Sequence, residues 1–185
     1  MKIGIDIDDT LTNTREIISK KWLEYILKRP NDNYNKNLPQ NINEFGDPYI
    51  NDFWDEYREE LSFNSSYKMD AATTIEKLKN DNHQLCIITS RPEEKYTNLN
   101  QRILNELKKN NIQITEIYTG IIDKGLFCLE NNIDILIDDS IKHCQRTISL
   151  GKNAILFNDD KSYKGFQTTN WNKIYDYINN IKNRK

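Results

Sequence analysis

Five short apolar runs, separated by segments of helical periodicity, constrain the fold of this 185-residue chain more than any other feature. The runs are Lys2–Ile7, Gln84–Ile88, Ile114–Tyr118, Ile133–Ile137 and Asn153–Phe157. Helices are expected over Asp70–Asn80, Glu93–Asn110, Lys124–Asn131, Ile141–Leu150 and Trp171–Ile181. Strands that alternate with helices form parallel βαβ units. We therefore predict an α/β fold, a Rossmann-like parallel five-stranded sheet with helices on both faces.

The stretch between the first and second expected strands is too long for a simple crossover. It carries two helical patterns and no strand pattern, and the helices are expected over Arg15–Lys28 and Ile50–Leu61. The polar, asparagine-rich segment Asn31–Asn41 lies between them, and we interpret it as a mobile loop. The predicted division is therefore a Rossmann-like core of residues 1–13 and 70–185 with a helical insertion of residues 14–69.

Polar side chains follow the predicted strands at the points where these strands end. Asp6 and Asp8 stand two residues apart at the end of the first strand, so their carboxylates are expected to point to the same side of the chain. The other candidates are Thr89, Ser90 and Arg91 after the second strand, Lys124 at the helix before the fourth strand, and Asp138 and Asp139 after the fourth strand. Because parallel strands end at one edge of the sheet, where such folds bind ligands, we expect these groups to converge there.

Four carboxylates at one place need a cation among them. Two like charges at ~4 Å repel by about 4 kcal/mol at an effective dielectric near 20. The candidate set contains neither His nor Cys, so Mg²⁺, which prefers oxygen ligands and keeps phosphate oxygens in its shell, is the expected ion. Lys124 and the hydroxyls of Thr89 and Ser90 are suited to the remaining phosphate oxygens. The residues therefore predict magnesium-dependent chemistry on a phosphate ester.

The charge balance argues against large anionic partners. Lys and Arg total 26 against 28 for Asp and Glu, a net charge of -2, so we expect neither a nucleic-acid polymer nor a membrane surface as partner. No apolar run approaches the ~20 residues of a membrane helix. Near the N-terminus, acidic residues stand where a signal peptide would need an apolar stretch, so a cytoplasmic location is expected. Cys86, Cys128 and Cys144 lie in apolar stretches and are predicted to be reduced core thiols.

In type and order, the candidate residues resemble the haloacid dehalogenase superfamily, and within it the phosphatases that use an aspartate nucleophile. Asp6–Thr10 resembles the first motif of that superfamily, DxDxT, and Thr89 and Lys124 resemble the second and third. The Asp138–Asp139 pair is similar to the fourth motif, whereas Asp9 stands where many members have glycine. The resemblance covers most of the chain outside residues 14–69.

The resemblance implies a role for each matched residue. Asp6 would attack phosphorus and form an aspartyl-phosphate, and Asp8 would act first as the acid and then as the base. Mg²⁺ would be held by the Asp6 carboxylate, the Asp8 main-chain carbonyl and the Asp138/Asp139 pair, with Asp139 favoured as the direct ligand. The phosphate would be bound by Thr89, Ser90 and Lys124.

The insertion resembles the helical cap that selects substrates in one branch of this superfamily. Phe53 and Trp54 are adjacent on an expected helix, so at least one of them faces away from the core of the cap. We regard both as candidate substrate-binding residues, together with Arg91, which could reach a phosphate or a carboxylate of the cap, or simply precede Pro92 at a helix start. The strings IGIDIDDT, TSR and IDDS are similar to 5′(3′)-deoxyribonucleotidases and bacterial nucleotidases, which implies a nucleoside monophosphate as substrate.

Other functions stay open beside a nucleotidase. The nearest alternative is a phosphatase for a sugar phosphate or another small phosphomonoester. A phosphorylatable receiver module also combines acidic residues, a hydroxyl and a lysine around Mg²⁺, but it places its acceptor aspartate on a middle strand and has no long insertion. The sequence leaves open the base and sugar preference, the 5′ or 3′ position of the phosphate, the choice between Asp138 and Asp139, and the oligomeric state, a homodimer included.

Overall fold

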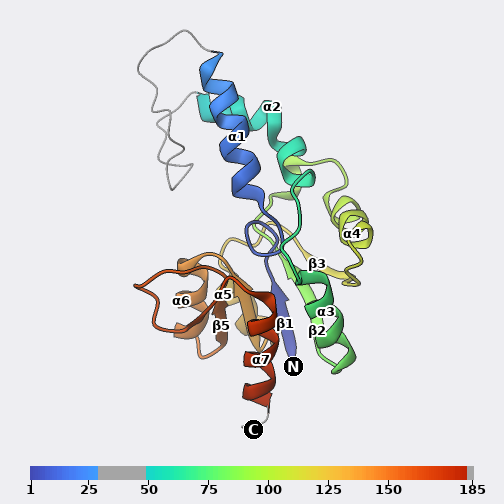
Figure 1. The fold of residues 1–185 in the computed structure, drawn as a ribbon, viewed down its shortest axis with the longest axis vertical. Coiled ribbons are helices and arrows are strands. Elements are labelled where there is room, and N and C mark those ends of the chain that lie inside the picture. The colour runs from blue at the N-terminus through green and yellow to red at the C-terminus, as the bar shows by residue number, and fades with distance from the viewer. Residues whose placement is uncertain (29–48, 183–185) are drawn as a thin grey trace. The chain divides into compact units, whose positions relative to one another are not determined.

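The computed structural model describes residues 1–28 and 49–182, and its centre is a parallel six-stranded sheet (Figure 1). The strand order is β3-β2-β1-β4-β5-β6. The strands are β1 (Lys2–Ile5), β2 (Gln84–Ile88), β3 (Glu116–Tyr118), β4 (Ile135–Asp138), β5 (Asn153–Leu156) and β6 (Phe166–Gln167). The α/β class and the parallel sheet are therefore confirmed, as is the helical insertion after the first strand.

The prediction of five strands is wrong by one strand. β6 has only two residues, and they continue the sheet because Phe166 pairs with Ile155 and Gln167 with Leu156. Two residues carry no periodic pattern, so only the pairing with β5 identifies this strand.

The helices of the core unit are α3 (Ala71–Asn80), α4 (Leu99–Lys109), α5 (Lys124–Glu130), α6 (Ile141–Ser149) and α7 (Trp171–Lys182). The helix expected over Glu93–Asn110 begins later than predicted. A short 3₁₀ turn, η2 (Glu93–Lys95), follows Pro92, and Asn98 has a φ of 54° directly before α4. Because a left-handed residue cannot continue a right-handed helix, η2 and α4 are separate elements.

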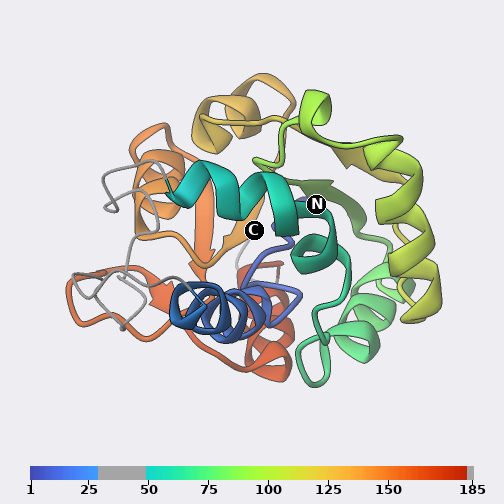
Figure 2. The ribbon, with the colours of Figure 1, turned by 90° about the horizontal axis from the view of Figure 1, so that it is seen from above.

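For parallel strands in this order, the rule that crossovers are right-handed places helices on both faces of the sheet. α5 packs against α6, and α3 packs against α7 (Figure 2). The core beneath α5 and α6 contains the three cysteines, Cys86, Cys128 and Cys144, all buried and none in a disulfide. The thiols thus act as small apolar groups in this core.

β1 lies in the middle of the sheet, between β2 and β4, and this position makes its carboxyl end the centre of the sheet edge. Gly4 allows the close packing around β1, because a Cβ at this position would lie 2.3 Å from Cδ1 of Ile88. Ile5 is in register with Ile87 of β2 and Ile137 of β4. The residues that follow these three strands are therefore neighbours.

The chain divides into two compact units, residues 1–12 with 67–185 and residues 13–66. The smaller unit contains α1 (Thr14–Leu27) and α2 (Tyr49–Phe63). Its core consists of Trp22, Tyr25, Ile26, Phe53 and Leu61. The predicted loop Asn31–Asn41 lies outside the described residues. None of the described helices is long and apolar enough to cross a membrane.

Candidate active site

The site begins where β1 ends and the chain turns. The amide of Asp6 still donates to the carbonyl of Ile137 on β4, at 2.9 Å. The carbonyl of Ile7 then accepts bonds from the amides of Leu11 and Thr12, and this closes a tight turn in which Asp9 has a φ of 56°. The turn fixes Asp6 and Asp8 at the edge of the sheet.

Lys124 links two carboxylates that come from different strands. Its Nζ donates to Oδ1 of Asp6 at 2.5 Å and to Oδ2 of Asp138 at 2.7 Å. All three residues are buried. Burial disfavours the charge of Lys124, but the attraction of Asp6 and Asp138 outweighs burial and raises the pKa of its ammonium above the ordinary value. Lys124 is therefore a charged group that neutralises only part of the negative charge around it.

A third carboxylate completes an acidic cluster. One oxygen each from Asp6, Asp138 and Asp139 lie within 4.8 Å of one another. Burial, followed by the neighbouring charges, raises the pKa of Asp6 to about 7 and that of Asp139 to about 8, although Lys124 lowers both. Without a further cation the charges of Asp6 and Asp139 are thus disfavoured, and the oxygen donors and spacing of the cluster suit a hard divalent cation such as Mg²⁺.

The segment after β2 is fixed by bonds to the segment after β3. The amide of Ile121 donates to the carbonyl of Thr89 at 3.0 Å, and the hydroxyl of Ser90 donates to the carbonyl of Ile121 at 2.8 Å. The amide of Gly120 donates to the carbonyl of Arg91 at 2.8 Å. Thr89 is 1% exposed, and its hydroxyl accepts a bond from the amide of Arg91. The backbone that presents these three residues is therefore held by the segment after β3.

Arg91 binds Asp8 through two parallel hydrogen bonds. Nε donates to Oδ2 at 2.9 Å, and Nη2 donates to Oδ1 at 2.6 Å. The Arg91 side chain is 6% exposed, whereas that of Asp8 is 38% exposed. Burial disfavours the charge of Arg91, but Asp8 outweighs this effect and raises the pKa of the guanidinium. The two carboxylates that leave β1 are thus paired with different cations, Asp6 with Lys124 and Asp8 with Arg91.

The structure brings most of the predicted site residues together in the core unit. Direct contacts join Asp6, Lys124 and Asp138, and Asp139 lies beside them. Phe53 and Trp54 belong to the other unit, where Phe53 is buried in the aromatic core and Trp54 packs against that core from its edge.

The bidentate pair between Arg91 and Asp8 was not predicted. The sequence does contain a signal for it, because β1 and β2 are parallel neighbours and Ile5 is in register with Ile87. Three residues beyond Ile5 and four beyond Ile87, the chain reaches Asp8 and Arg91. Strand register, once known, therefore brings the two side chains to adjacent positions.

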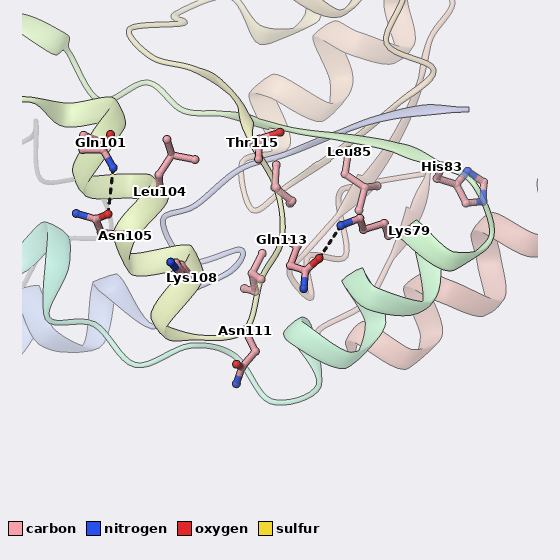
Figure 3. A pocket seen from close by; sticks show the side chains of 12 residues that line it. Lys79, His83, Leu85, Gln101, Leu104, Asn105, Lys108, Asn111, Gln113 and Thr115 are labelled. Atoms are coloured by element: carbon pink, nitrogen blue, oxygen red, sulfur yellow. Dashed lines mark hydrogen bonds between the residues drawn. The ribbon is translucent and has the colours of Figure 1, made fainter.

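A cavity of about 810 Å³ lies elsewhere on the core unit, between α3, α4 and the segment before β3 (Figure 3). Its floor includes Leu85 and Leu104, and Lys79 donates to Gln113 at its rim at 2.7 Å. None of the predicted site residues lines this cavity. Its chemistry is thus separate from that of the acidic cluster.

No protein-family model matches the chain, and no curated protein matches it. Solved structures are nevertheless similar over nearly the whole chain. One is described as a predicted phosphatase from Clostridium acetobutylicum, with a TM-score of 0.69, 17% identity and coverage of 96% of this chain and 97% of its own.

Two further structures extend this comparison. One is described as a predicted phosphoglycolate phosphatase from Haemophilus somnus 129PT, with a TM-score of 0.67, 15% identity and coverage of 95% and 96% of the two chains. The other is a HAD family hydrolase from Deinococcus radiodurans R1 with bound phosphate and sodium, with a TM-score of 0.65, 12% identity and coverage of 94% and 92%. The chain therefore has the fold of the haloacid dehalogenase superfamily of hydrolases. At these identities the likeness is one of fold.

Proposed function

We propose that this protein is a Mg²⁺-dependent phosphomonoester hydrolase that works through an aspartyl-phosphate on Asp6. The observation that supports this proposal most strongly is the contact of Lys124 with both Asp6 and Asp138, beside the third carboxylate of Asp139. A buried lysine next to several carboxylates supplies the positive charge that a phosphate needs, while the acids supply a nucleophile and oxygen ligands for a cation.

The acidic cluster suits a magnesium site. The proposed ligands are the carboxylates of Asp6 and Asp139, the main-chain carbonyl of Asp8 and, directly or through water, Asp138. Asp139 is favoured over Asp138 as the direct ligand because both oxygens of Asp138 already accept bonds, one from Lys124 and one from the amide of Ser140 at 2.8 Å. When bound, Mg²⁺ neutralises the charge on the phosphate oxygens and so lowers the barrier to attack.

The proposed reaction has two displacements, and different residues act in each. An oxygen of Asp6 attacks phosphorus, and the alkoxide of the ester leaves with a proton from Asp8. Asp8 then takes a proton from the water that releases the phosphate from Asp6. Thr89 and Lys124 bind the phosphate oxygens during both steps, and Ser90 joins them when its hydroxyl releases the carbonyl of Ile121.

The proposed substrate is a nucleoside monophosphate. This choice rests on the similarity of the motif strings to nucleotidases and on the aromatic content of the helical unit, where Trp54 is the more accessible of the two candidate stacking residues because Phe53 is only 1% exposed. The second candidate is another small phosphomonoester. A structure of similar fold, described as a predicted phosphoglycolate phosphatase, favours that alternative.

A screen of phosphate esters in the presence of Mg²⁺ tests both levels of the proposal. The panel contains nucleoside 5′- and 3′-monophosphates, sugar phosphates, phosphoglycolate and 4-nitrophenyl phosphate, and released phosphate is measured. We expect catalytic release with the highest kcat/KM on a nucleotide. A sugar phosphate or phosphoglycolate hydrolysed faster than every nucleotide would contradict the substrate. A lasting phosphoenzyme without turnover would contradict the hydrolase and favour the receiver module.

A further inference from the structure

The side chain of Arg91 is buried and donates two hydrogen bonds to Asp8, the residue proposed as acid and base. We propose that Arg91 is a positioning residue, which holds the Asp8 carboxylate in place as the base that activates water in the second displacement. This inference rests on the proposed function. It assigns Arg91 to the chemistry of Asp8 instead of to the substrate.

The geometry of the pair supports orientation over simple charge balance. A guanidinium that binds both oxygens of a carboxylate fixes the plane of that carboxylate as well as its distance. The Arg91 side chain is itself held, because it is 6% exposed and extends from backbone that is bonded to Gly120 and to the hydroxyl of Thr89. Asp8, on a turn that ends β1, thus takes its orientation from the neighbouring strand.

The pair leaves Asp8 able to accept a proton. An ionised carboxylate has about four lone-pair sites, and the two bonds from Arg91 occupy two of them. The side chain of Asp8 remains 38% exposed, so a water molecule can reach its carboxylate. Arg91 therefore restricts the motion of the base without blocking it.

The step that Arg91 would support is the hydrolysis of the aspartyl-phosphate. The oxygen of water attacks phosphorus, and the bond between phosphorus and the Asp6 oxygen breaks, with its electron pair returning to the Asp6 carboxylate. The proton of that water passes to Asp8, and inorganic phosphate leaves. Asp8 returns the proton to the leaving alkoxide of the next substrate molecule, so the cycle is balanced.

Steady-state and stopped-flow kinetics with 4-nitrophenyl phosphate test the role of Arg91. Nitrophenolate leaves with little need for a proton, so kcat/KM reports the attack by Asp6, whereas kcat reports the water step. We expect Arg91→Gln to lower kcat by roughly 10- to 100-fold, with a matching fall in KM, an unchanged kcat/KM and a burst of nitrophenolate. Arg91→Lys should restore part of kcat, because it keeps the charge but not the two parallel bonds.

The matched control is Arg146→Gln, which removes the pair between Arg146 and Asp123 on the surface of the same unit. We expect its kinetic constants to stay unchanged. If Arg91→Gln lowered kcat/KM and raised KM without a burst, Arg91 would bind substrate instead, and an unchanged kcat would remove any role for it. No turnover in the unsubstituted protein on any ester would overturn the proposed function itself, and the role of Arg91 with it.

A thermal-unfolding cycle tests the contact without relying on turnover. Asp8→Asn, Arg91→Gln and the double variant are compared with the unsubstituted protein. Because Arg91 is buried, Asp8→Asn should lower the melting temperature, and the double variant should lose less than the sum of the two single losses. Additive losses would mean that the two side chains do not interact, and would overturn the inference.

Discussion

The two compact units of this chain are stabilised by different kinds of contact. In the core unit the buried edge of the sheet holds ion pairs, Lys124 with Asp6 and Asp138, and Arg91 with Asp8. In the helical unit of residues 13–66 the core is aromatic, with the rings of Trp22 and Phe53 5.1 Å apart at 88°. Buried charges need specific partners, whereas aromatic rings are stabilised mainly by the large area they bury and prefer edge-to-face or offset contacts. The residues proposed to act in the reaction therefore depend on specific partners in the core unit, whereas the core of the helical unit depends mainly on packing.

The largest expected effect is a loss of phosphate release in a variant whose core unit keeps its packing. Asp6→Asn keeps the size of the side chain but removes the proposed nucleophile, so we expect phosphate release to fall by about 1,000-fold or more while the circular-dichroism spectrum stays native. The control is Asp134→Asn, which alters a carboxylate that accepts a bond from the amide of Lys2 before β4 and should keep ordinary turnover. Full activity of Asp6→Asn would refute the role of Asp6.

Removal of the buried ammonium group of Lys124 should affect both activity and stability. Lys124→Met leaves two buried carboxylates without their shared partner, so we expect the free energy of unfolding to fall by about 3–5 kcal/mol and turnover by roughly 100-fold. Chemical denaturation and phosphate release measure the two effects. Lys79→Met, at a lysine bonded to Gln113 on the surface, should change stability by less than about 0.5 kcal/mol.

Two adjacent aromatic residues of α2 separate packing from substrate binding within the helical unit. Phe53 is 1% exposed and surrounded by rings, so Phe53→Ala should lower the free energy of unfolding by about 3–5 kcal/mol. Trp54→Ala should destabilise less but raise the KM for nucleotides roughly tenfold, since stacking on a base is worth about 1–3 kcal/mol. Equal effects of both variants on KM would contradict the assignment of Phe53 to packing and of Trp54 to substrate.

A further expected effect in the core unit is the pH dependence of stability without a divalent ion. The pKa of Asp6 is raised to about 7 and that of Asp139 to about 8, from an ordinary 3.8, so the folded state binds more protons than the unfolded state between about pH 4 and 8. These two groups therefore reduce stability as the pH rises through this window. Saturating Mg²⁺ should offset the loss, and raise stability by roughly 2–3 kcal/mol at pH 8 but much less at pH 5.

Asp139→Asn provides the control for this pH experiment. The variant lacks one of the two titrating groups, so thermal melts should depend less steeply on pH and respond less to Mg²⁺. A Mg²⁺ effect of equal size at pH 5 and pH 8 would mean that the ion does not bind these carboxylates.

The sheet of the core unit was largely predictable, because β1, β2, β4 and β5 are apolar runs longer than a turn and are separated by amphipathic helices. The helices expected over Lys124–Asn131 and Ile141–Leu150 end within one residue of α5 and α6. The acidic cluster was predictable for the same reason, since parallel strands end at one edge.

Pairing and local conformation could not be predicted from periodicity. β6 exists only because two residues pair with β5, and the start of α4 depends on the left-handed conformation of Asn98. The partner of Arg91 depends on the register between β1 and β2, and the position of Phe53 in its core depends on which face of α2 meets α1. The start of α4 thus depends on a local backbone conformation, whereas the other three features depend on contacts between separate segments of the chain.

The Mg²⁺ dependence of phosphate release tests the central claim most directly, namely that Asp6, Asp138 and Asp139 gather at the sheet edge to hold a divalent ion for phosphate chemistry. We predict that strong chelation abolishes turnover, that added Mg²⁺ restores it, and that Asp139→Asn raises the Mg²⁺ concentration needed for half-maximal rate. Undiminished turnover under chelation, or an Asp139→Asn variant with an unaltered Mg²⁺ requirement, would contradict the claim.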